Sequence, residues 1–247
     1  MKIAALADIH SNIFALRAVV RDAKRRGVEM VVNLGDVLYG PIAPKATFDF
    51  LCEYDFVTIC GNQDRQIVEA ASEDSEPNPT MQFVLDELGE APIGWLKSFP
   101  FDQYLNEEVY LCHGAPAGDT IYLLENIDSG EAHLRSDGEI QDLLLGVSSS
   151  LIICGHTHIP RTIALSSGQV VVNPGSVGLP AYTDDEPVRH SMENFCPHAS
   201  YAIIENSRAG WCVEHIKVAY NYQEAAHAAA RHKRDDWAHF LTTGRGL

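Results

Sequence analysis

Lys2-Ile-Ala-Ala-Leu-Ala-Asp8-Ile-His10 is an apolar run that ends in two side chains able to bind a metal ion. A β-strand that is apolar along its length and polar at its carboxyl end is how an open α/β sheet presents a site. Four further runs end in the same way, and their closing residues are Asp36, Asn62, His113, and the pair His156 and His158. One such ending would mean little, but five of them, all offering carboxylate, amide or imidazole groups, predict one converging metal site.

The first predicted strand leads directly into a predicted helix. Ser11 or Asn12 can cap this helix, its apolar residues recur at helical spacing, and Gly27 can end it. A strand over residues 29–34 completes a βαβ unit, for which parallel pairing is the default. Further helices are expected over about 45–54, 81–88 and 93–99.

The second half of the chain is richer in predicted strands, which are expected over 103–105, 109–112, 151–154, 162–165, 170–173, 201–205 and 211–219. The alanine-rich tail from Gln223 to about Leu241 is predicted to form one helix. The long segment from Leu179 to Ala199 shows no clear periodicity, so we expect a loop there, of a length that often forms a lid or a binding loop. The simplest account is an α/β fold in which residues 1–247 form one domain with two β-layers and helices outside.

The composition is typical of a soluble intracellular enzyme. No apolar stretch is long enough to span a bilayer, and the chain begins with a strand instead of a signal peptide, so we expect no membrane partner. The six cysteines show no CxxC spacing, and Cys60, Cys112 and Cys154 lie inside apolar runs as small buried hydrophobes would. Reduced thiols and a cytoplasmic location are therefore expected.

The residues at the strand ends have the chemistry of a two-metal site. Asp8 and His10, one residue apart, can face the same cation as the chain turns, and Asp36 can have two oxygens free to bridge two metals. Mixed imidazole and carboxylate ligands suit Mn²⁺ first, with Fe, Zn²⁺ or Ni²⁺ as alternatives. Two cations roughly 3.5–4 Å apart can activate a bridging hydroxide and neutralise a phosphoryl oxygen in an in-line displacement.

The ordered set of motifs resembles a known family, the calcineurin-like metallophosphoesterases. The matching pieces, which cover most of the chain in order, are Asp8-Ile-His10, Gly35-Asp36, Gly61-Asn62-Gln63-Asp64, His113 and Gly155-His156-Thr157-His158. Asp8-Ile-His10-Ser-Asn12 and Asn173-Pro-Gly-Ser-Val177 look especially like its small bacterial and archaeal phosphodiesterase branch.

The resemblance implies a fold and a division of the ligands between two metal ions. The fold implied is a β-sandwich flanked by helices, in αββα layers. The first metal would be held by Asp8, His10, Asp36 and His158, and the second by Asp36, Asn62, His113 and His156. Asn12 and Asn173 are expected to brace the loops behind the metals.

One position departs from the family pattern. Where the family commonly has Gly-Asn-His-Asp or Gly-Asn-His-Glu, this chain has Gln63 before Asp64. The resemblance implies that the histidine protonates the leaving group or stabilises the transition state while the adjacent acid orients it, so Gln63 and Asp64 are the predicted catalytic residues. Gln63 can donate a hydrogen bond but cannot deliver a proton near neutral pH. Because general acid catalysis is worth ~10²–10⁴-fold, substrates with poor leaving groups should suffer most.

Three further residues are candidates for binding substrate. Arg65 could hold a phosphate, since a guanidinium matches phosphate bidentately, or it could pair with a nearby acid. Arg189 and His190 lie in the predicted loop 179–199 and are candidates for substrate contact through that loop.

The net charge of −16 limits the partners of the protein. It argues against a surface that binds a nucleic-acid polymer through its phosphates. Part of the acidity lies in residues 69–76, which we expect to be a solvated loop. A small phosphorylated substrate need not be repelled, because two bound divalent cations would dominate the local field. The sequence does not reveal the oligomeric state.

These patterns predict a dinuclear-metal hydrolase of phosphodiesters or nucleotide phosphoanhydrides, in which a metal-bridging hydroxide attacks phosphorus. One alternative is a catalytically weak scaffold of the same fold that binds other proteins, which should have altered ligands. Another is a protein serine/threonine phosphatase, which should use the histidine that Gln63 replaces.

Overall fold

The computed structural model describes residues 1–72 and 77–247. One five-stranded sheet has the order β14-β13-β1-β2-β3, with the strands β1 (Lys2–Leu6), β2 (Met30–Asn33), β3 (Val57–Thr58), β13 (Ala199–Ser207) and β14 (Gly210–Val218). A second five-stranded sheet has the order β4-β5-β8-β10-β9, with the strands β4 (Asp102–Asn106), β5 (Val109–Cys112), β8 (Leu151–Ile153), β9 (Arg161–Ala164) and β10 (Val170–Asn173). Two short hairpins join β6 (Glu125–Asn126) with β7 (His133–Leu134) and β11 (Ala181–Asp184) with β12 (His190–Glu193).

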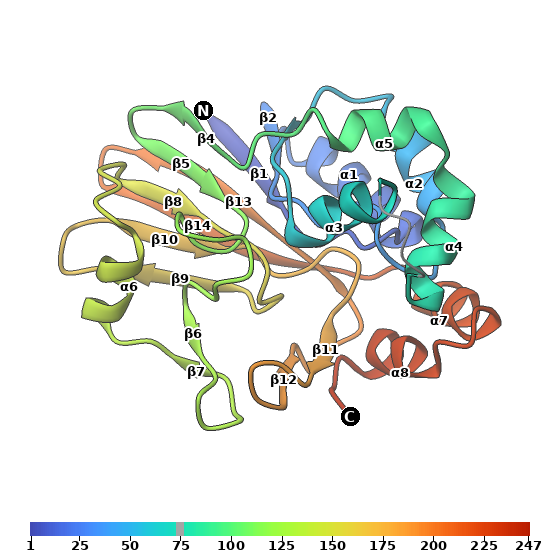
Figure 1. Cartoon of the computed structure of the whole chain (residues 1–247). Helices are drawn as coiled ribbons and strands as arrows, with labels where there is room; N and C mark the ends of the chain where they lie inside the picture. The colour runs from blue at the N-terminus through green and yellow to red at the C-terminus, as the bar shows by residue number, and fades with distance from the viewer. Residues whose placement is uncertain (73–76) are drawn as a thin grey trace.

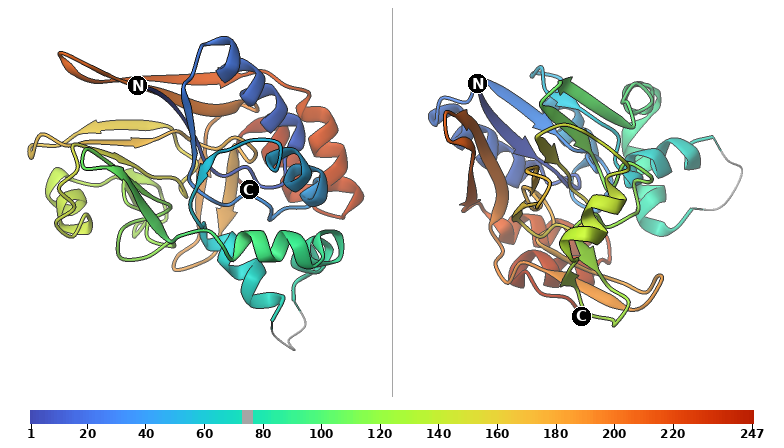
Figure 2. Two further views of the ribbon diagram at one scale, coloured as in Figure 1. Left: turned by 90° about the horizontal axis from the view of Figure 1, so that it is seen from above. Right: turned by 90° about the vertical axis from the view of Figure 1, so that its left-hand side faces the viewer.

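Helices cover the outer faces of the two sheets (Figure 1). Their bounds are α1 (Ile13–Arg25), α2 (Pro44–Leu51), α3 (Asn62–Ala70), α4 (Pro79–Leu88), α5 (Glu90–Leu96), α6 (Asp137–Leu143), α7 (Tyr222–Arg231) and α8 (Asp235–Thr243). The left view of Figure 2, taken from above, separates the two sheets into layers, so the expected α/β sandwich flanked by helices is confirmed. No helix in the described ranges is both long and apolar enough to cross a membrane.

The alternation of side chains along each strand builds the layers. In β1, Ile3 and Ala5 pack between the two sheets, whereas Ala4 and Leu6 pack against the helices of the first sheet. Successive residues of a strand point to opposite faces, so a strand covered on both faces is apolar throughout. In β8 of the second sheet, Ile153 packs between the sheets and Ile152 packs in the cluster that contains Ile140 of α6.

Strand direction places the carboxyl ends that matter for the site. β1 runs parallel to β2, and β2 runs parallel to β3. In the second sheet, β5 and β10 both run parallel to β8. The predicted ligands and Asn173 therefore all lie at or after the carboxyl ends of these six strands.

Two expectations for the second half of the chain are wrong in detail. The segment 179–199 contains the β11–β12 hairpin, whose four-residue strands are too short to show a period. The tail forms two helices instead of one, because the chain turns at Lys233, whose φ is +61°. The two helices pack on each other and on Leu179 and Ala181, beside the hairpin (Figure 1).

In the first half, helix α3 was not expected, and it starts at Asn62, shortly after β3 ends at Thr58. The Asp64 carboxylate accepts a hydrogen bond from the Gly61 N–H at 3.1 Å, which caps the helix. The predicted acidic loop 69–76 begins inside this helix, and residues 73–76 lie outside the described residues.

Replacing Leu111 by alanine tests the core between the two sheets. Leu111 in β5 is fully buried there, so Leu111→Ala should lower the free energy of unfolding by about 2–5 kcal/mol. The exposed Leu134 in β7 is the matched control, and its replacement by alanine should change stability by less than about 0.5 kcal/mol. Urea denaturation followed by circular dichroism measures both, and equal effects of the two substitutions would contradict this packing.

Candidate metal centre

The structure brings the seven predicted ligands together at the carboxyl ends of strands from both sheets. Asp8 and His10 follow β1, Asp36 follows β2, Asn62 follows β3, His113 follows β5, and His156 and His158 follow β8. Their potential ligand atoms form two groups of three within 4.8 Å of one another, which are Asp8, His10 and His158, and Asp36, His113 and His156. Segments up to 150 residues apart in sequence therefore meet at one point, as the strand endings predict.

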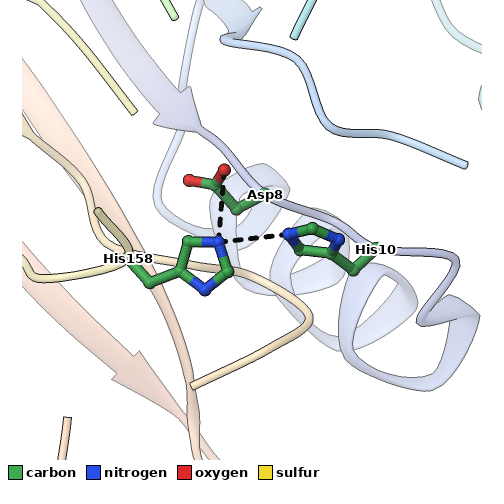
Figure 3. A group of neighbouring side chains, drawn as sticks. All are labelled: Asp8, His10 and His158. Atoms are coloured by element: carbon green, nitrogen blue, oxygen red, sulfur yellow. Dashed lines mark hydrogen bonds and ion pairs between the residues drawn. The ribbon is translucent and has the colours of Figure 1, made fainter. Parts of the chain in front are cut away.

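In the first group, the Nε2 atoms of two imidazole rings lie close to each other. His158 Nε2 lies 3.1 Å from His10 Nε2 and 3.4 Å from Asp8 Oδ1 (Figure 3). The opposite ring nitrogens contact backbone carbonyls, His10 Nδ1 at 3.2 Å from Tyr39 O and His158 Nδ1 at 2.7 Å from Leu179 O. If both Nδ1 atoms donate to these carbonyls, both Nε2 atoms carry lone pairs that point at each other. A cation between them satisfies this arrangement.

Asp8 supplies independent support for a cation at this place. Its Oδ1 is buried and has no hydrogen-bond partner among the described residues. A buried carboxylate oxygen without a partner is costly unless a positive charge compensates it. Its other oxygen, Oδ2, accepts a hydrogen bond from the His156 N–H at 3.2 Å, which links the two ligand groups.

The second group has the same arrangement around His113. The Nδ1 atom of this ring lies 2.6 Å from Leu34 O, and Nε2 lies 3.0 Å from Asn62 Oδ1 and 3.5 Å from Asp36 Oδ2. Burial disfavours a charge on His113, but the Asp36 carboxylate outweighs burial and raises the pKa of the ring to about 10. Positive charge is therefore favoured at this point, and a metal ion can supply it in place of a proton.

Two further histidines of the groups, His10 and His156, are held neutral, as ligands must be. Burial lowers the pKa of His10 to about 4, and the neighbouring His158 adds to that effect. Burial likewise lowers the pKa of His156 to about 4, with a further contribution from His113. A neutral imidazole offers a lone pair to a metal near neutral pH.

Asp36 stands between the two groups. Its Oδ2 lies 3.9 Å from His10 Nε2 in the first group and 3.5 Å from His113 Nε2 in the second. Its Oδ1 accepts a hydrogen bond from the Gln63 N–H at 2.8 Å. We expected both oxygens to be free, but the start of α3 occupies one of them, so Oδ2 is the atom placed to face both groups.

Five of the seven residues have the left-handed backbone conformation that L-amino acids rarely adopt. The φ angles are +56° at Asp8, +47° at His10, +54° at Asp36, +70° at His156 and +62° at His158. Such conformations cost of order 1–3 kcal/mol each and persist only where the surroundings enforce them. The neighbouring loops do so through hydrogen bonds from Asp8 N–H to Gly35 O at 3.0 Å and from His10 N–H to Asp36 O at 2.9 Å.

Two asparagines brace these loops, as we expected. Asn173 at the end of β10 donates through Nδ2 to Gly155 O at 2.7 Å. Asn12 caps α1 by accepting from the Ala15 N–H at 3.1 Å, and it donates to Gly178 O at 2.8 Å. Each side chain therefore ties a ligand-bearing turn to a second loop.

The predicted catalytic residues have different positions. Gln63 lines the cavity that opens onto the ligands, whereas Asp64 does not. The Asp64 carboxylate is fully buried and accepts from the backbone N–H groups of Val37 and Gly61. This placement lets Asp64 fix the turns that carry Asp36 and Asn62 without contact with substrate.

The three predicted substrate-binding residues do not line this cavity. Arg65 donates to both oxygens of Asp119, at 2.7 and 3.1 Å, so its pairing with an acid is the alternative that the structure shows. Arg189 is exposed and pairs with Asp185 at 3.4 Å. His190 is buried, and its Nε2 lies 3.0 Å from the hydroxyl of Tyr122.

Sequence reasoning missed several residues that line the cavity. Tyr122 and Tyr182 pack their rings on the predicted ligands His156 and His158, both at 4.7 Å between ring centroids. Trp237 of α8 contacts His10 edge to face at 5.7 Å. These aromatic residues lie outside the motifs, and the sequence of the tail did not indicate which element its helices would contact.

Replacing Gly61 by alanine tests the close packing of the two turns. An added Cβ would lie 2.2 Å from Asp36 Oδ1 and 2.3 Å from the Asp36 N, so Gly61→Ala should displace Asp36 and weaken Mn²⁺ binding at least tenfold, roughly the range for disturbing the support of a ligand. Gly94→Ala is the control, because its Cβ would meet none of the described atoms within 4 Å. Isothermal titration with Mn²⁺ measures both, and unchanged affinity in Gly61→Ala would show that the turns are not packed in this way.

Comparisons with known proteins agree with this geometry. A family profile described as the calcineurin-like phosphoesterase superfamily domain matches residues 1–194. The uncharacterized protein MJ0912 of Methanocaldococcus jannaschii is 25% identical over 261 residues, which cover 95% of this chain and 94% of that protein. The crystal structure of a metallophosphoesterase from Sphaerobacter thermophilus has the same fold, with a TM-score of 0.74 and 22% identity over 99% of this chain and 100% of that one. The chain belongs to the calcineurin-like phosphoesterase superfamily.

Proposed function

We propose that this phosphoesterase uses two divalent metal ions to hydrolyse phosphodiesters or nucleotide phosphoanhydrides. The observation that carries the proposal is the position of Asp36 Oδ2, which faces a nitrogen of both ligand groups. The first ion would be held by Asp8, His10, Asp36 and His158, and the second by Asp36, Asn62, His113 and His156. When bound, such a pair of ions polarises a phosphoryl group and lowers the pKa of an attacking water.

The choice of metal follows from the ligands. Four imidazoles, two carboxylates and one amide oxygen are borderline and hard donors, and they favour first-row divalent ions. We propose Mn²⁺ as the native ion, with Fe, Zn²⁺ and Ni²⁺ as alternatives that the same residues accept. The buried Cys112 and Cys154 are not competing ligands, because burial raises the pKa of both thiols.

Gln63 favours substrates whose leaving group needs no proton. It is the cavity residue that stands where the family commonly has a histidine, and its amide can donate a hydrogen bond but not a proton. Anhydrides and activated diesters, whose leaving groups are stable anions, fit this residue better than alkyl phosphomonoesters.

The size of the cavity fits a small substrate. Its volume is about 270 Å³, and its walls include Tyr39, Tyr122 and Tyr182. Ligand pockets usually span ~300–1,000 Å³, so this cavity is at the small end of the range and suits the phosphoryl part of a small molecule. A small phosphorylated molecule is therefore the proposed substrate, and a nucleic-acid polymer is not.

The alternatives are less well supported. A scaffold that had lost catalysis need not keep five of the seven predicted ligands in strained conformations. Six of the seven form the two ligand groups, and Asn62 Oδ1 lies 3.0 Å from His113 Nε2 in the second. A protein serine/threonine phosphatase must expel an alkoxide, for which Gln63 offers no proton. For the location we propose the cytoplasm, which the six unpaired cysteines support.

The first test is hydrolysis of bis-p-nitrophenyl phosphate against p-nitrophenyl phosphate by metal-stripped protein supplied with Mn²⁺. We expect metal-dependent turnover that favours the diester. A preference for the monoester would contradict the argument from Gln63 while leaving the enzyme class intact. No turnover of either ester by protein with two metal ions bound would count against the proposed function.

Replacing ligands should remove metal and activity together. Asp36→Asn and His156→Ala should each lower turnover by more than the ~10–100-fold that is typical of losing an outer-shell partner. His133→Ala is the matched control, because His133 is exposed in β7 and should leave both properties unchanged. Metal content by mass spectrometry and turnover are measured on the same samples, and activity in a metal-depleted variant would overturn the mechanism.

Restoring the common histidine should change the dependence on the leaving group. Gln63→His should accelerate esters with poor leaving groups by up to ~10²–10⁴-fold while affecting nitrophenyl esters much less, because only the former need a proton. The measurement is the slope of log kcat against leaving-group pKa for a series of aryl phosphodiesters. An equal gain across the series would show that position 63 does not act through proton transfer.

A further inference from the structure

The metal cavity has one arginine and no lysine among its described lining residues, and that arginine is Arg234. It precedes α8 and lies outside residues 1–194, which the family profile covers. It is therefore a feature of this chain that the family match does not account for.

Two elements hold the Arg234 guanidinium in place. Its Nε and Nη2 donate to the carboxylate of Asp236 at 2.8 and 2.6 Å, and its Nη1 donates to Thr80 Oγ1 of α4 at 2.5 Å. The guanidinium also lies over the ring of Trp237, 5.3 Å from the centroid. Such a fixed side chain loses little entropy when it binds a ligand.

These contacts leave part of the guanidinium available. Of its five N–H groups, one on Nε, one on Nη1 and one on Nη2 are used by Asp236 and Thr80. One N–H on each terminal nitrogen has no acceptor among the described residues. The side chain is 28% exposed and lines the cavity, so a ligand in the cavity can contact it.

A single aromatic residue separates this guanidinium from the ligands. Trp237 contacts Arg234 on its face and the ring of His10 at 5.7 Å edge to face. His10, Trp237 and Arg234 line the same cavity. An anion held by Arg234 would therefore lie in the same cavity as a phosphoryl group at the metal ligands and not in a separate site.

We propose that Arg234 binds a second phosphate of the substrate, one that is not attacked. This inference rests on the proposed function and narrows it, because it selects nucleotide phosphoanhydrides, which carry an adjacent phosphate, over simple diesters, which do not. A guanidinium with two free N–H groups can hold phosphate oxygens at two points. Both oxygens of Asp236 already accept from Arg234, so the phosphate would bind through the two remaining N–H groups.

The test compares inhibition by phosphate and by tripolyphosphate, with bis-p-nitrophenyl phosphate as reporter and free Mn²⁺ held constant. In the native protein tripolyphosphate should bind much more tightly than phosphate. Arg234→Gln should reduce the ratio of the two inhibition constants about tenfold or more, the usual value of hydrogen bonds to a charged group. Arg234→Lys should give a ratio between those of the native protein and Arg234→Gln, since lysine keeps the positive charge but lacks the two terminal nitrogens of the guanidinium. Arg231→Gln, an exposed position at the end of α7, should keep the native ratio.

Two results would overturn the proposal. One is a ratio that Arg234→Gln leaves unchanged. The other is an equal loss of phosphate and tripolyphosphate binding, with weaker Mn²⁺ affinity, which would mean that Arg234 only supports the cavity wall. If the native protein does not turn over the reporter, calorimetric binding of tripolyphosphate to the Mn²⁺-loaded native and Arg234→Gln proteins decides the proposal independently of the proposed function.

Discussion

The site depends on the turns that follow the carboxyl ends of parallel strands in the two sheets. After β1, β2 and β8 the chain enters the left-handed region at predicted ligand residues, whose potential ligand atoms lie in two close groups. The turns support one another, because Asp8 and His10 donate their N–H groups to the turn that contains Gly35 and Asp36. No single segment could hold its conformation without the next.

This mutual support explains why uncompensated groups can persist at the centre. The Nε2 atoms of His10 and His158 lie 3.1 Å apart, and Asp8 Oδ1 is buried with no hydrogen-bond partner among the described residues. Strained backbone and unsatisfied polar atoms both lower the stability of the fold, so packing in the core of the sandwich must offset this loss. Cations at the two ligand groups would relieve it, which couples metal binding to the stability of the fold.

The convergence of the predicted ligand residues could be foreseen from the sequence because the signal is local. A polar residue at the end of an apolar strand indicates a site at the edge of the sheet, whatever the position of that strand in the sheet. Parallel pairing then brings the strand ends together. The two β-layers followed from the same pattern. The start of α3 at Asn62 was missed, and with it the bond from the Gln63 N–H that occupies one oxygen of Asp36.

The residues around the ligands could not be predicted, because their roles depend on distant partners. Arg65 is committed to Asp119, which lies 54 positions away in the sequence. His190 follows a turn and points inward to Tyr122 only because β12 pairs with β11. Arg234 reaches the cavity because the tail breaks at Lys233, where a single helix was expected.

The central claim is that one carboxylate, Asp36, joins two metal sites. A crystal structure of the Mn²⁺-loaded protein, with anomalous scattering recorded at the manganese edge, tests it most directly. The account predicts two peaks, one among Asp8, His10 and His158 and the other among Asn62, His113 and His156, with Asp36 in contact with both. A single peak, or two peaks of which only one touches Asp36, would contradict it.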